Sequence, residues 1–319
     1  MSQVHSVSHA RQVINTVESP GGAAHSVVAA SWVRSMRRHN LKPDGTAGEA
    51  CLSGRELTER RQKSDHILRL AQPTLDKIFQ SVGNAGCCVI LSDADGVIID
   101  KRGAPSDDAC FREWRLTEGT MWDESHQGTN GIGTCLAEAR PVTIHRDQHF
   151  FAHNIAMSCM DAPVFDQNGQ LVAALDVSSC RADDTESWLS LIGSFVIDAA
   201  RRVESDIFRA AFPKARIMMG EQHGRAGAVL IAIDSDDVII GGTRAARRLF
   251  QLPQDLKTDP RPAADILSDR SSQVGFKAAE RSELRRTLAR TSGNVSRAAK
   301  LLGISRATMY RRLKRAKLS

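Results

Sequence analysis

The end of the chain carries basic and hydroxyl side chains at spacings that suit contact with nucleic acid. Thr308, Arg311, Arg312 and Arg315 lie off the apolar stripe of a predicted short helix. Arg and Lys attract backbone phosphates, and Arg can also donate two parallel hydrogen bonds to guanine. The chemistry that these residues predict is therefore DNA binding.

Two short helices around a tight turn must position these side chains. Asn294 is a good N-cap for the first helix, Gly303 lies where that helix ends, and Ser305 can cap the second. Apolar residues recur at helical spacing in both helices, so that each buries one face: Val295, Ala298, Ala299 and Leu302, then Met309, Leu313 and Ala316. This pattern predicts a helix-turn-helix. The alternative is a solvated basic helix at a frayed terminus.

Net charge favours the DNA-binding interpretation. Residues 276–319 hold thirteen Lys and Arg against two Glu, a net charge of +11, whereas the whole chain carries only +6. The first 275 residues therefore carry about −5. Basic charge that is concentrated in one short segment is expected where nucleic acid is bound.

This segment resembles the Fis-type DNA-binding domain of bacterial enhancer-binding activators. The shared motifs are Gly293-Asn294, Ala298-Ala299, Leu302-Gly303-Ile304, Ser305-Arg306 and Thr308-Met309-Tyr310-Arg311. The resemblance implies that the second helix enters the major groove of double-stranded DNA, with contacts to bases or nearby phosphates from Ser305, Arg306 and Thr308. It implies DNA-backbone contacts from Asn294, Ser296, Arg311 and Arg312, and Arg315 of the same basic helix completes the candidate set. The preceding helix, residues 277–290 with Leu284 and Leu288, would pair two copies into a homodimer.

The composition of the 319 residues disfavours several other classes of protein. No run approaches the ~18 continuous apolar residues of a membrane span, and the N-terminus lacks the basic start and apolar run of a signal peptide. The seven Cys are scattered without a C-x-x-C pair, which favours buried thiols over disulfides or zinc. We therefore expect a cytoplasmic protein of two or three domains, with no membrane contact and no metal or cofactor.

The middle of the chain predicts an α+β domain. Two β-hairpins are expected, one across residues 93–96 and one across residues 166–169, where Asn-Gly is a strong turn signal. A strand-borne Pro163 must then lie at an edge or a bulge. Long helices are expected at residues 64–81, where Pro73 predicts a kink or a break, and from residue 185 to about 212. The fold class is therefore α+β, an antiparallel sheet flanked by helices, plus the small all-α domain at the C-terminus.

Four parts of the chain follow from these patterns. Residues 1–64 form an N-terminal helical extension, in which residues 1–25 show no pattern and Trp32 packs a small helical core. Residues 65–210 form the α+β domain. Residues 211–275 hold a strand, turn, strand and short helix that resemble the first part of a PAS fold, followed by a linker at 251–275. Residues 276–319 form the helix-turn-helix domain.

Residues 25–210 resemble the GAF-containing region of the acetoin-catabolism activator family of bacterial regulators. The shared motifs are Ser31-Trp32-Val33-Arg34-Ser35, Gly128-Thr129-Asn130-Gly131-Ile132-Gly133-Thr134, His149-Phe150 and Ala162-Pro163-Val164-Phe165. The resemblance implies a sensory module that binds a small molecule. Because residues 110–155 are dense in polar and aromatic side chains, we expect the effector between this segment and the sheet. The candidate liners are Trp114, Trp122, Asn130 and His149.

Catalysis is not indicated by this sequence. The Gly-rich run at 128–134 lacks the full dinucleotide fingerprint, and a tight turn into a helix around 135–139 is favoured over direct ligand contact. His145, His149 and His153 are spaced by four residues, but a strand ending at His145 keeps them off one helix, which argues against a metal site. Cys159 with a nearby His lacks a third orienting group.

The function predicted from the sequence is transcriptional regulation. The activator family carries an AAA+ ATPase between sensor and DNA-binding domain, but these 319 residues contain no Gly-Lys dipeptide and hence no G-x-x-x-x-G-K-[ST] loop. The expectation is a regulator that senses a small molecule and acts without ATP hydrolysis, with RNA polymerase as a further candidate partner. The alternatives are a nucleoid-type architectural protein whose GAF-like part only dimerises it, and an enzyme that also binds DNA.

Overall fold

The computed structural model describes residues 3–24, 26–46, 48, 50–181, 185–220, 227–256, 258–267, 275–316 and 318. The chain divides into two compact units, Met1–Arg261 and Pro262–Ser319. The larger unit is built on a five-stranded antiparallel sheet flanked by helices, and the smaller unit contains a helix-turn-helix. The predicted fold class is confirmed. In the part of the chain that the structure describes, no helix combines the length and apolar character needed to cross a membrane.

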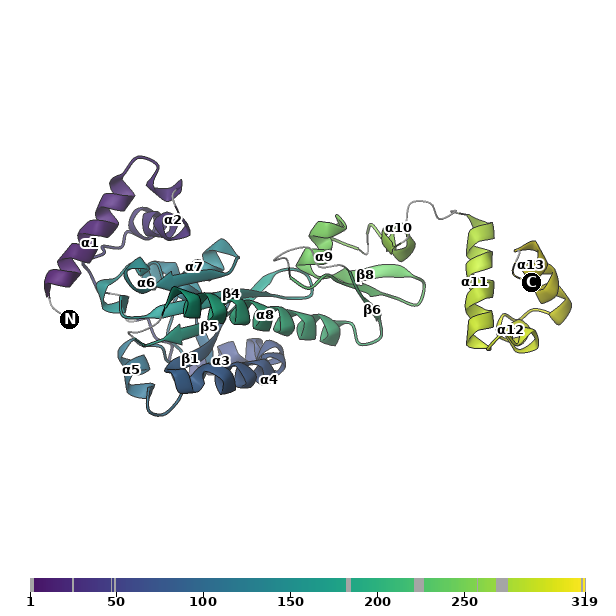
Figure 1. Cartoon of the computed structure of the whole chain (residues 1–319), viewed down its shortest axis with the longest axis horizontal. Helices are drawn as coiled ribbons and strands as arrows, with labels where there is room; N and C mark the ends of the chain where they lie inside the picture. The colour runs from purple at the N-terminus through teal and green to yellow at the C-terminus, as the bar shows by residue number, and fades with distance from the viewer. Residues whose placement is uncertain are drawn as a thin grey trace. The chain divides into compact units, whose positions relative to one another are not determined.

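The central sheet of the larger unit has the strand order β2-β1-β5-β4-β3. Figure 1 labels β1, β5 and β4 of this sheet. Its strands are β1 (Cys87–Asp93), β2 (Ile98–Arg102), β3 (Val142–His145), β4 (Ser158–Phe165) and β5 (Leu171–Ser179). The pairs β1–β2 and β4–β5 are the two predicted hairpins, which are confirmed. β3 pairs with residues 158–161 of β4, so Pro163 lies beyond its reach at the edge position that its missing N–H requires.

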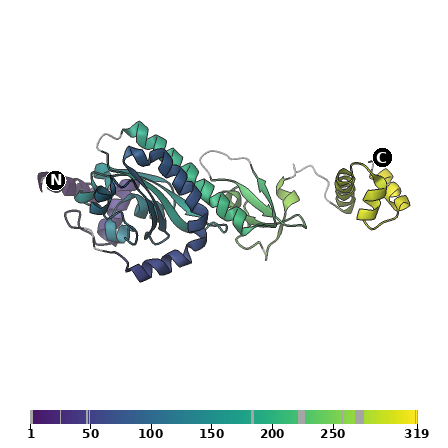
Figure 2. The same ribbon diagram turned by 90° about the horizontal axis from the view of Figure 1, so that it is seen from below.

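Helices cover both faces of this sheet, and alternate strand residues enter separate cores. One face packs against α4 (Asp65–Val82) and α8 (Glu186–Ala211), which lie side by side in Figure 2. The other face carries α5 (Asp108–Glu113), α6 (Glu124–Gln127) and α7 (Gly131–Glu138). Pro73 lies inside α4, which is one uninterrupted helix, so the predicted break does not occur.

A second sheet, in which β6, β7 and β8 pair antiparallel, lies beyond the C-terminal end of α8. Its order is β6-β7-β8-β9, formed by Arg216–Met219, Leu230–Ile233, Val238–Gly242 and Arg261–Pro262, and α9 (Arg244–Leu249) follows β8. The predicted strand, turn, strand and helix are confirmed, but the sheet has two further strands. The predicted linker at 251–275 also contains β9 and α10 (Ala263–Leu267), while residues 257 and 268–274 lie outside the described residues.

The N-terminal segment differs from its prediction. Residues 3–18, for which no pattern was expected, form helix α1 (Gln3–Glu18), and α2 (Val27–Val33) follows. Val13 and Val17 of α1 are buried against Trp32, Phe150 and Phe151, so apolar packing stabilises a helix whose intervening residues are polar. Trp32 packs a small core, as predicted. Residues 1, 2 and 25 lie outside the described residues.

Shorter helical segments connect these elements. Helix α3 (Gly54–Lys63) is capped by Ser53, whose side chain accepts a hydrogen bond from the Glu56 amide. The remaining segments are single turns or a π-helix: Gly22–Ala24, Arg34–Arg38, Gly83–Ala85, Arg146–Gln148 and Ala152–Asn154.

A buried polar network fastens the N-terminal helices to the sheet domain. The Ser31 hydroxyl donates to Glu124 Oε1 at 2.5 Å, and Arg34 Nε donates to Glu124 Oε2 at 2.7 Å. Arg34 Nη1 also donates to Glu138 Oε1 at 2.7 Å. These contacts join α2 and the turn after it to α6 and α7. The motif Ser31–Ser35 therefore has a structural role in this chain.

Removal of the Arg34 guanidinium should destabilise the larger unit, because Glu124 and Glu138 would lose their cation. We expect Arg34→Ala to lower the free energy of unfolding by about 2–3 kcal/mol, less than for a fully buried pair because the Arg34 side chain is 25% exposed. Urea denaturation followed by tryptophan fluorescence measures this loss. The control is Arg55→Ala, whose surface pair with Glu59 should contribute less than about 0.5 kcal/mol. Equal losses in the two variants would contradict the role of the network.

Candidate DNA-binding and effector sites

The helix-turn-helix consists of three helices around a small apolar core. They are α11 (Phe276–Arg290), α12 (Val295–Leu301) and α13 (Arg306–Arg315). The predicted apolar stripes face this core, which confirms the predicted pattern. Its buried members are Leu284, Ala298, Ala299, Met309 and Leu313.

A left-handed residue ends α12 and sets the turn before α13. Gly303 has φ +65°, its amide donates to the Lys300 carbonyl at 3.2 Å, and the Ile304 amide donates to the Ala299 carbonyl at 3.0 Å. This pair of bonds is the Schellman arrangement, in which glycine adopts positive φ without a steric cost. The predicted turn at Gly303 is confirmed.

Two of the predicted DNA-contacting residues also cap the helices. Asn294 Oδ1 accepts from the Arg297 amide at 3.0 Å, and Ser305 Oγ accepts from the Thr308 amide at 3.1 Å. Thr308 is half-buried, and its hydroxyl lies 2.9 Å from Ser305 Oγ. The other members of the predicted set are exposed: Asn294, Ser296, Ser305, Arg306, Arg311, Arg312 and Arg315.

The four arginines of α13 do not share one environment. Glu280 of α11 pairs with Arg312 at 3.2 Å and with Arg315 at 2.6 Å. Within the described residues, Arg306 and Arg311 form no ion pair; Arg306 lies over the Tyr310 ring, and Arg311 donates to the Thr308 hydroxyl at 3.4 Å. Arg306 and Arg311 are therefore the arginines of α13 most available to an external anion. The sequence did not predict the role of Glu280.

All four predicted effector liners take part in the packing of the larger unit. Trp122 is buried and its indole N–H donates to the Arg115 carbonyl at 3.1 Å. Asn130 caps α7, because its Oδ1 accepts from the Gly133 amide at 2.8 Å. His149 is buried, and half-buried Trp114 packs edge-on against the Phe111 ring.

The Gly-rich run leads into helix α7, as the favoured interpretation predicted, but the helix begins inside the run and not near residue 135. Asn130 precedes the helix, and Gly131 begins it. A Cβ atom at Gly131 would collide with the Asp161 carboxylate and with Cys159. Glycine at this position therefore lets the helix approach β4 closely.

A pair of buried carboxyl groups faces α7 from the sheet. Asp161 of β4 lies opposite Asp176 of β5, and both side chains are buried. Ser178 Oγ donates to Asp176 at 2.9 Å, whereas Asp161 has no hydrogen-bonding partner among the described residues other than the Asp176 carboxyl. Burial and the neighbouring Asp176 raise the pKa of Asp161 well above its usual range, and burial raises the pKa of Asp176 to about 7. The sequence prediction missed this pair.

His149 and Cys159 extend the same polar cluster. Cys159 Sγ lies 3.4 Å from His149 Nε2 and 3.2 Å from Ser178 Oγ. Burial lowers the pKa of His149 to about 4 and raises the pKa of the Cys159 thiol, so both groups are neutral near pH 7. A neutral thiol is a weak nucleophile. The structure thus brings His149 to the acidic pair without creating an activated cysteine.

The three spaced histidines do not share a helix, in agreement with the prediction. His145 ends β3, His149 lies between two short turns, and His153 lies in the second of them. Across the described residues there is no group of three or more side chains arranged to hold a metal ion.

Neutralisation of Asp161 should stabilise the protein, and more so at higher pH. Between the ordinary pKa and the raised folded-state pKa, the folded state binds more protons than the unfolded state, so stability falls as pH rises. We expect Asp161→Asn to raise Tm more at pH 8 than at pH 5. Each kcal/mol of unfavourable free energy that the substitution removes should raise Tm by about 2–4 °C. Differential scanning calorimetry at the two pH values tests this.

The matched control for that measurement is Asp95→Asn, at an exposed carboxylate that pairs with Arg60. An exposed ion pair contributes little to the free energy of unfolding. This variant should therefore be no more stable than the unmodified protein at either pH. If Asp161→Asn is destabilising at both pH values, the carboxylate has a favourable partner and the interpretation is wrong.

Comparison with known proteins identifies two domains in the chain. Residues 66–203 match the GAF domain family, and residues 276–315 match the bacterial regulatory protein, Fis family. The chain is 30% identical over 233 residues to the acetoin catabolism regulatory protein of Cupriavidus necator, an alignment that covers 72% of this chain and 35% of that protein. It is 29% identical over 177 residues to the acetoin dehydrogenase operon transcriptional activator AcoR of Bacillus subtilis, which covers 55% of this chain and 29% of that protein. These matches confirm both resemblances seen in the sequence.

The fold also has a counterpart of known structure. A chain in the crystal structure of the E. coli DhaR(N)–DhaL complex superposes with a TM-score of 0.52 at 17% identity, covering 72% of this chain and 78% of that chain. This likeness supports the antiparallel sheet flanked by helices. The chain spans about a third of the length of the two curated relatives.

Proposed function

We propose that this chain, which contains a GAF domain and a Fis-family helix-turn-helix domain, is a sequence-specific DNA-binding regulator of transcription controlled by a small molecule. The observation that carries the proposal is the concentration of a net charge of +11 in residues 276–319, on a helix-turn-helix whose exposed helix α13 presents Arg306 and Arg311. Its relatives named above are regulators of transcription, which supports the same conclusion.

In this proposal, α13 enters the major groove of double-stranded DNA. Its N-terminal residues Ser305, Arg306 and Thr308 contact base edges or nearby phosphates, because recognition helices place their first residues deepest in the groove. Asn294 and Ser296, at the start of α12, contact the DNA backbone. Arg311, Arg312 and Arg315 add charge to the same helix.

The active form is proposed to be a homodimer that pairs through α11. Phe276 at the start of this helix is 96% exposed, and Leu288 is only partly covered by the core of its own domain. Incompletely covered apolar side chains at both ends of α11 offer apolar surface to a second copy. Two copies would present two α13 helices to adjacent DNA half-sites.

The effector is proposed to bind between the sheet and residues 110–155. The buried acidic pair supports this location, because Asp161 has no partner besides the Asp176 carboxyl and a hydroxyl-bearing molecule would satisfy its remaining hydrogen-bonding capacity. His149 adjoins the acidic pair through Cys159. Trp122 and Asn130 pack in the same layer, so entry of an effector requires a shift of this layer.

Regulation is proposed to occur without ATP hydrolysis by these residues. The 319 residues contain no Gly-Lys dipeptide and therefore no phosphate-binding loop of the P-loop type. The remaining routes are occupation of a promoter and recruitment of RNA polymerase, in each of which the position of the bound helix-turn-helix decides the outcome.

Loss of Arg306 and Arg311 should weaken DNA binding and flatten its salt dependence. Each phosphate contact that is removed reduces the slope of log K against log salt by about one, and loss of a base contact costs about 1–3 kcal/mol. We expect Arg306→Ala with Arg311→Ala to lower affinity for a fragment of the protein's own promoter by at least about tenfold. Gel-shift titration at several salt concentrations measures both effects.

The control for the α13 variant is Arg285→Ala with Arg290→Ala, which removes two exposed charges from α11 of the same domain. This change alters net charge equally but leaves α13 intact. A loss of affinity as large as that of the α13 variant would show that α13 has no special role, and unchanged affinity in the α13 variant would refute DNA recognition by this helix.

Glu280→Gln should have the opposite effect. The substitution removes one negative charge and releases Arg312 and Arg315 from their ion pairs. We expect tighter DNA binding, by about threefold to tenfold, and a steeper salt dependence. Glu283→Gln, which affects a pair with Arg286 on α11 only, is the control. Equal effects of the two substitutions would show that the pairs with α13 do not limit binding.

A further inference from the structure

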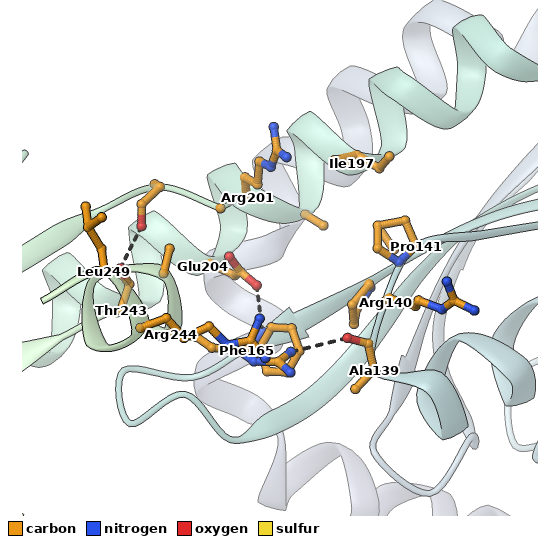
Figure 3. Close-up of a pocket in the computed structure, with 17 residues that line it drawn as sticks. Ala139, Arg140, Pro141, Phe165, Ile197, Arg201, Glu204, Thr243, Arg244 and Leu249 are labelled. Atoms are coloured by element: carbon orange, nitrogen blue, oxygen red, sulfur yellow. Dashed lines mark hydrogen bonds between the residues drawn. The ribbon is translucent and has the colours of Figure 1, made fainter. Parts of the chain in front are cut away.

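The larger unit contains a cavity of about 450 Å³ that the proposed function does not use. It lies where β4, the C-terminal half of α8 and α9 meet, between the two sheets (Figure 3). Its volume falls within the usual range of small-molecule sites. It is separate from the polar cluster at Asp161, because its β4 residues include Ala162 and Pro163 but its lining does not include Asp161, Asp176 or His149.

Apolar side chains form much of the cavity wall. Pro163 and Phe165 come from β4, Ile197 from α8 and Leu249 from the end of α9. Such a wall suits the hydrocarbon part of a ligand, since burial of apolar surface is favourable. The cavity therefore suits an organic ligand better than an inorganic ion.

Four arginines and one carboxyl group supply the charged part of the lining among the described residues. Arg140 precedes β3, Arg201 belongs to α8, and Arg244 and Arg248 belong to α9, whereas Glu204 of α8 is the acid. Arginine donates paired hydrogen bonds to carboxylates and phosphates, and several arginines around one cavity strongly favour an anion. Arg140 and Arg201 also pair with Glu138 and Asp198 at 3.4 and 3.2 Å, so Arg244 and Arg248 are the arginines of the lining without an ion pair among the described residues.

Arg244 is held in place by contacts with β4 and with the residue that follows α7. Its guanidinium lies 4.0 Å from the centroid of the Phe165 ring, and its Nη1 donates to the Ala139 carbonyl at 3.2 Å. Figure 3 shows Arg244 and Glu204 approaching Phe165 from α9 and α8 respectively. A cation fixed in this way loses little conformational freedom when it binds an anion.

We propose that this cavity binds a small organic monocarboxylate, with its carboxylate on the arginines and its apolar body against Phe165 and Ile197. A phosphate dianion fits less well, because the apolar walls and the nearby Glu204 oppose a second negative charge. The site would fasten α9 and the second sheet to α8 and β4. It is additional to the effector site proposed above and does not depend on it.

Glu204 gives the site a pH dependence. Its Oε1 accepts from the Phe165 amide at 3.0 Å, and the groups around it are Arg201 of α8, Arg244 of α9 and the backbone of Gly227. Burial raises the pKa of Glu204 to about 7, although the amide and the two arginines oppose the rise. The acid is therefore neutral below pH 7 and ionised above it, so a bound carboxylate should be repelled as pH rises through 7.

Isothermal titration calorimetry of the full chain tests the proposal with benzoate as the probe, and with benzyl alcohol and inorganic phosphate as comparisons. We expect benzoate to bind at pH 6 with a Kd below about 1 mM and the other two compounds to bind at least about tenfold more weakly. Absence of benzoate binding, equal binding of benzyl alcohol, or preference for phosphate would each overturn the proposal.

Two neighbouring arginines on α8 provide the matched variants. Arg201 lines the cavity, whereas Arg202 lies with Thr74 and Lys77 on another surface of the helix. Arg201→Gln and the exposed Arg248→Gln should each weaken benzoate binding by about tenfold, and Arg202→Gln should leave it unchanged. Equal weakening by Arg201→Gln and Arg202→Gln would place the probe elsewhere.

Glu204→Gln tests the acid separately. In the unmodified chain, the benzoate Kd should rise between pH 6 and pH 8, by up to about tenfold for full ionisation of Glu204. In Glu204→Gln, the Kd should stay at its low-pH value across this range. A Kd that rises equally in both proteins would exclude Glu204 as the source of the pH dependence. DNA binding in the absence of benzoate should be normal in all these variants, so failure here is separable from failure of the regulator assignment.

Discussion

The crowding of positive charge in the smaller unit is the constraint on which its structure and proposed function both depend. Residues 276–319 carry a net charge of +11, so their basic side chains repel one another. The two acids of this segment, Glu280 and Glu283, both lie on α11. Exposed ion pairs contribute little, at most about 1 kcal/mol each. The small core around Leu284, Ala298 and Met309 must therefore supply most of the stability. DNA phosphates would relieve the repulsion that this core tolerates.

Buried polar groups of the larger unit differ in whether they have favourable partners. At Ser31, Arg34 and Glu124, each group has a charged or hydrogen-bonding partner, and the network holds the N-terminal helices on the domain. At Asp161, the only partner of the buried carboxyl is a second buried carboxyl, that of Asp176. Because two buried carboxyl groups side by side are destabilising, the acidic pair costs the fold stability, whereas the Ser31 network contributes to it.

The sequence predicted the features that are determined by short-range signals. Capping by Asn294 and Ser305, the left-handed turn at Gly303 and the Asn168-Gly169 hairpin each depend on a few adjacent residues. Helix α1 was missed because its apolar residues are diluted by polar ones, and the helix gains its stability from contact with Phe150 and Phe151. The local pattern alone does not contain that contact.

The two candidate binding sites of the larger unit depend on long-range pairing. Asp161 and Asp176 could have been matched by aligning the hairpin strands about Asn168-Gly169, since each is an acid in an apolar strand. The cavity at Arg244 could not have been predicted in this way, because its hydrogen bond to Ala139 joins residues 105 positions apart. The predicted liners Trp122 and Asn130 were selected by composition, which does not distinguish a pocket from a packed core.

Competition for the full chain between DNA sequences tests sequence-specific regulation most directly. Fluorescence anisotropy would follow a labelled fragment of the protein's own promoter as unlabelled promoter DNA or unrelated DNA of equal length and AT content is added. A regulator should be displaced by the promoter at concentrations at least about a thousandfold lower than by unrelated DNA. Equal displacement by the two DNAs would contradict sequence-specific regulation and would favour an architectural DNA-binding protein.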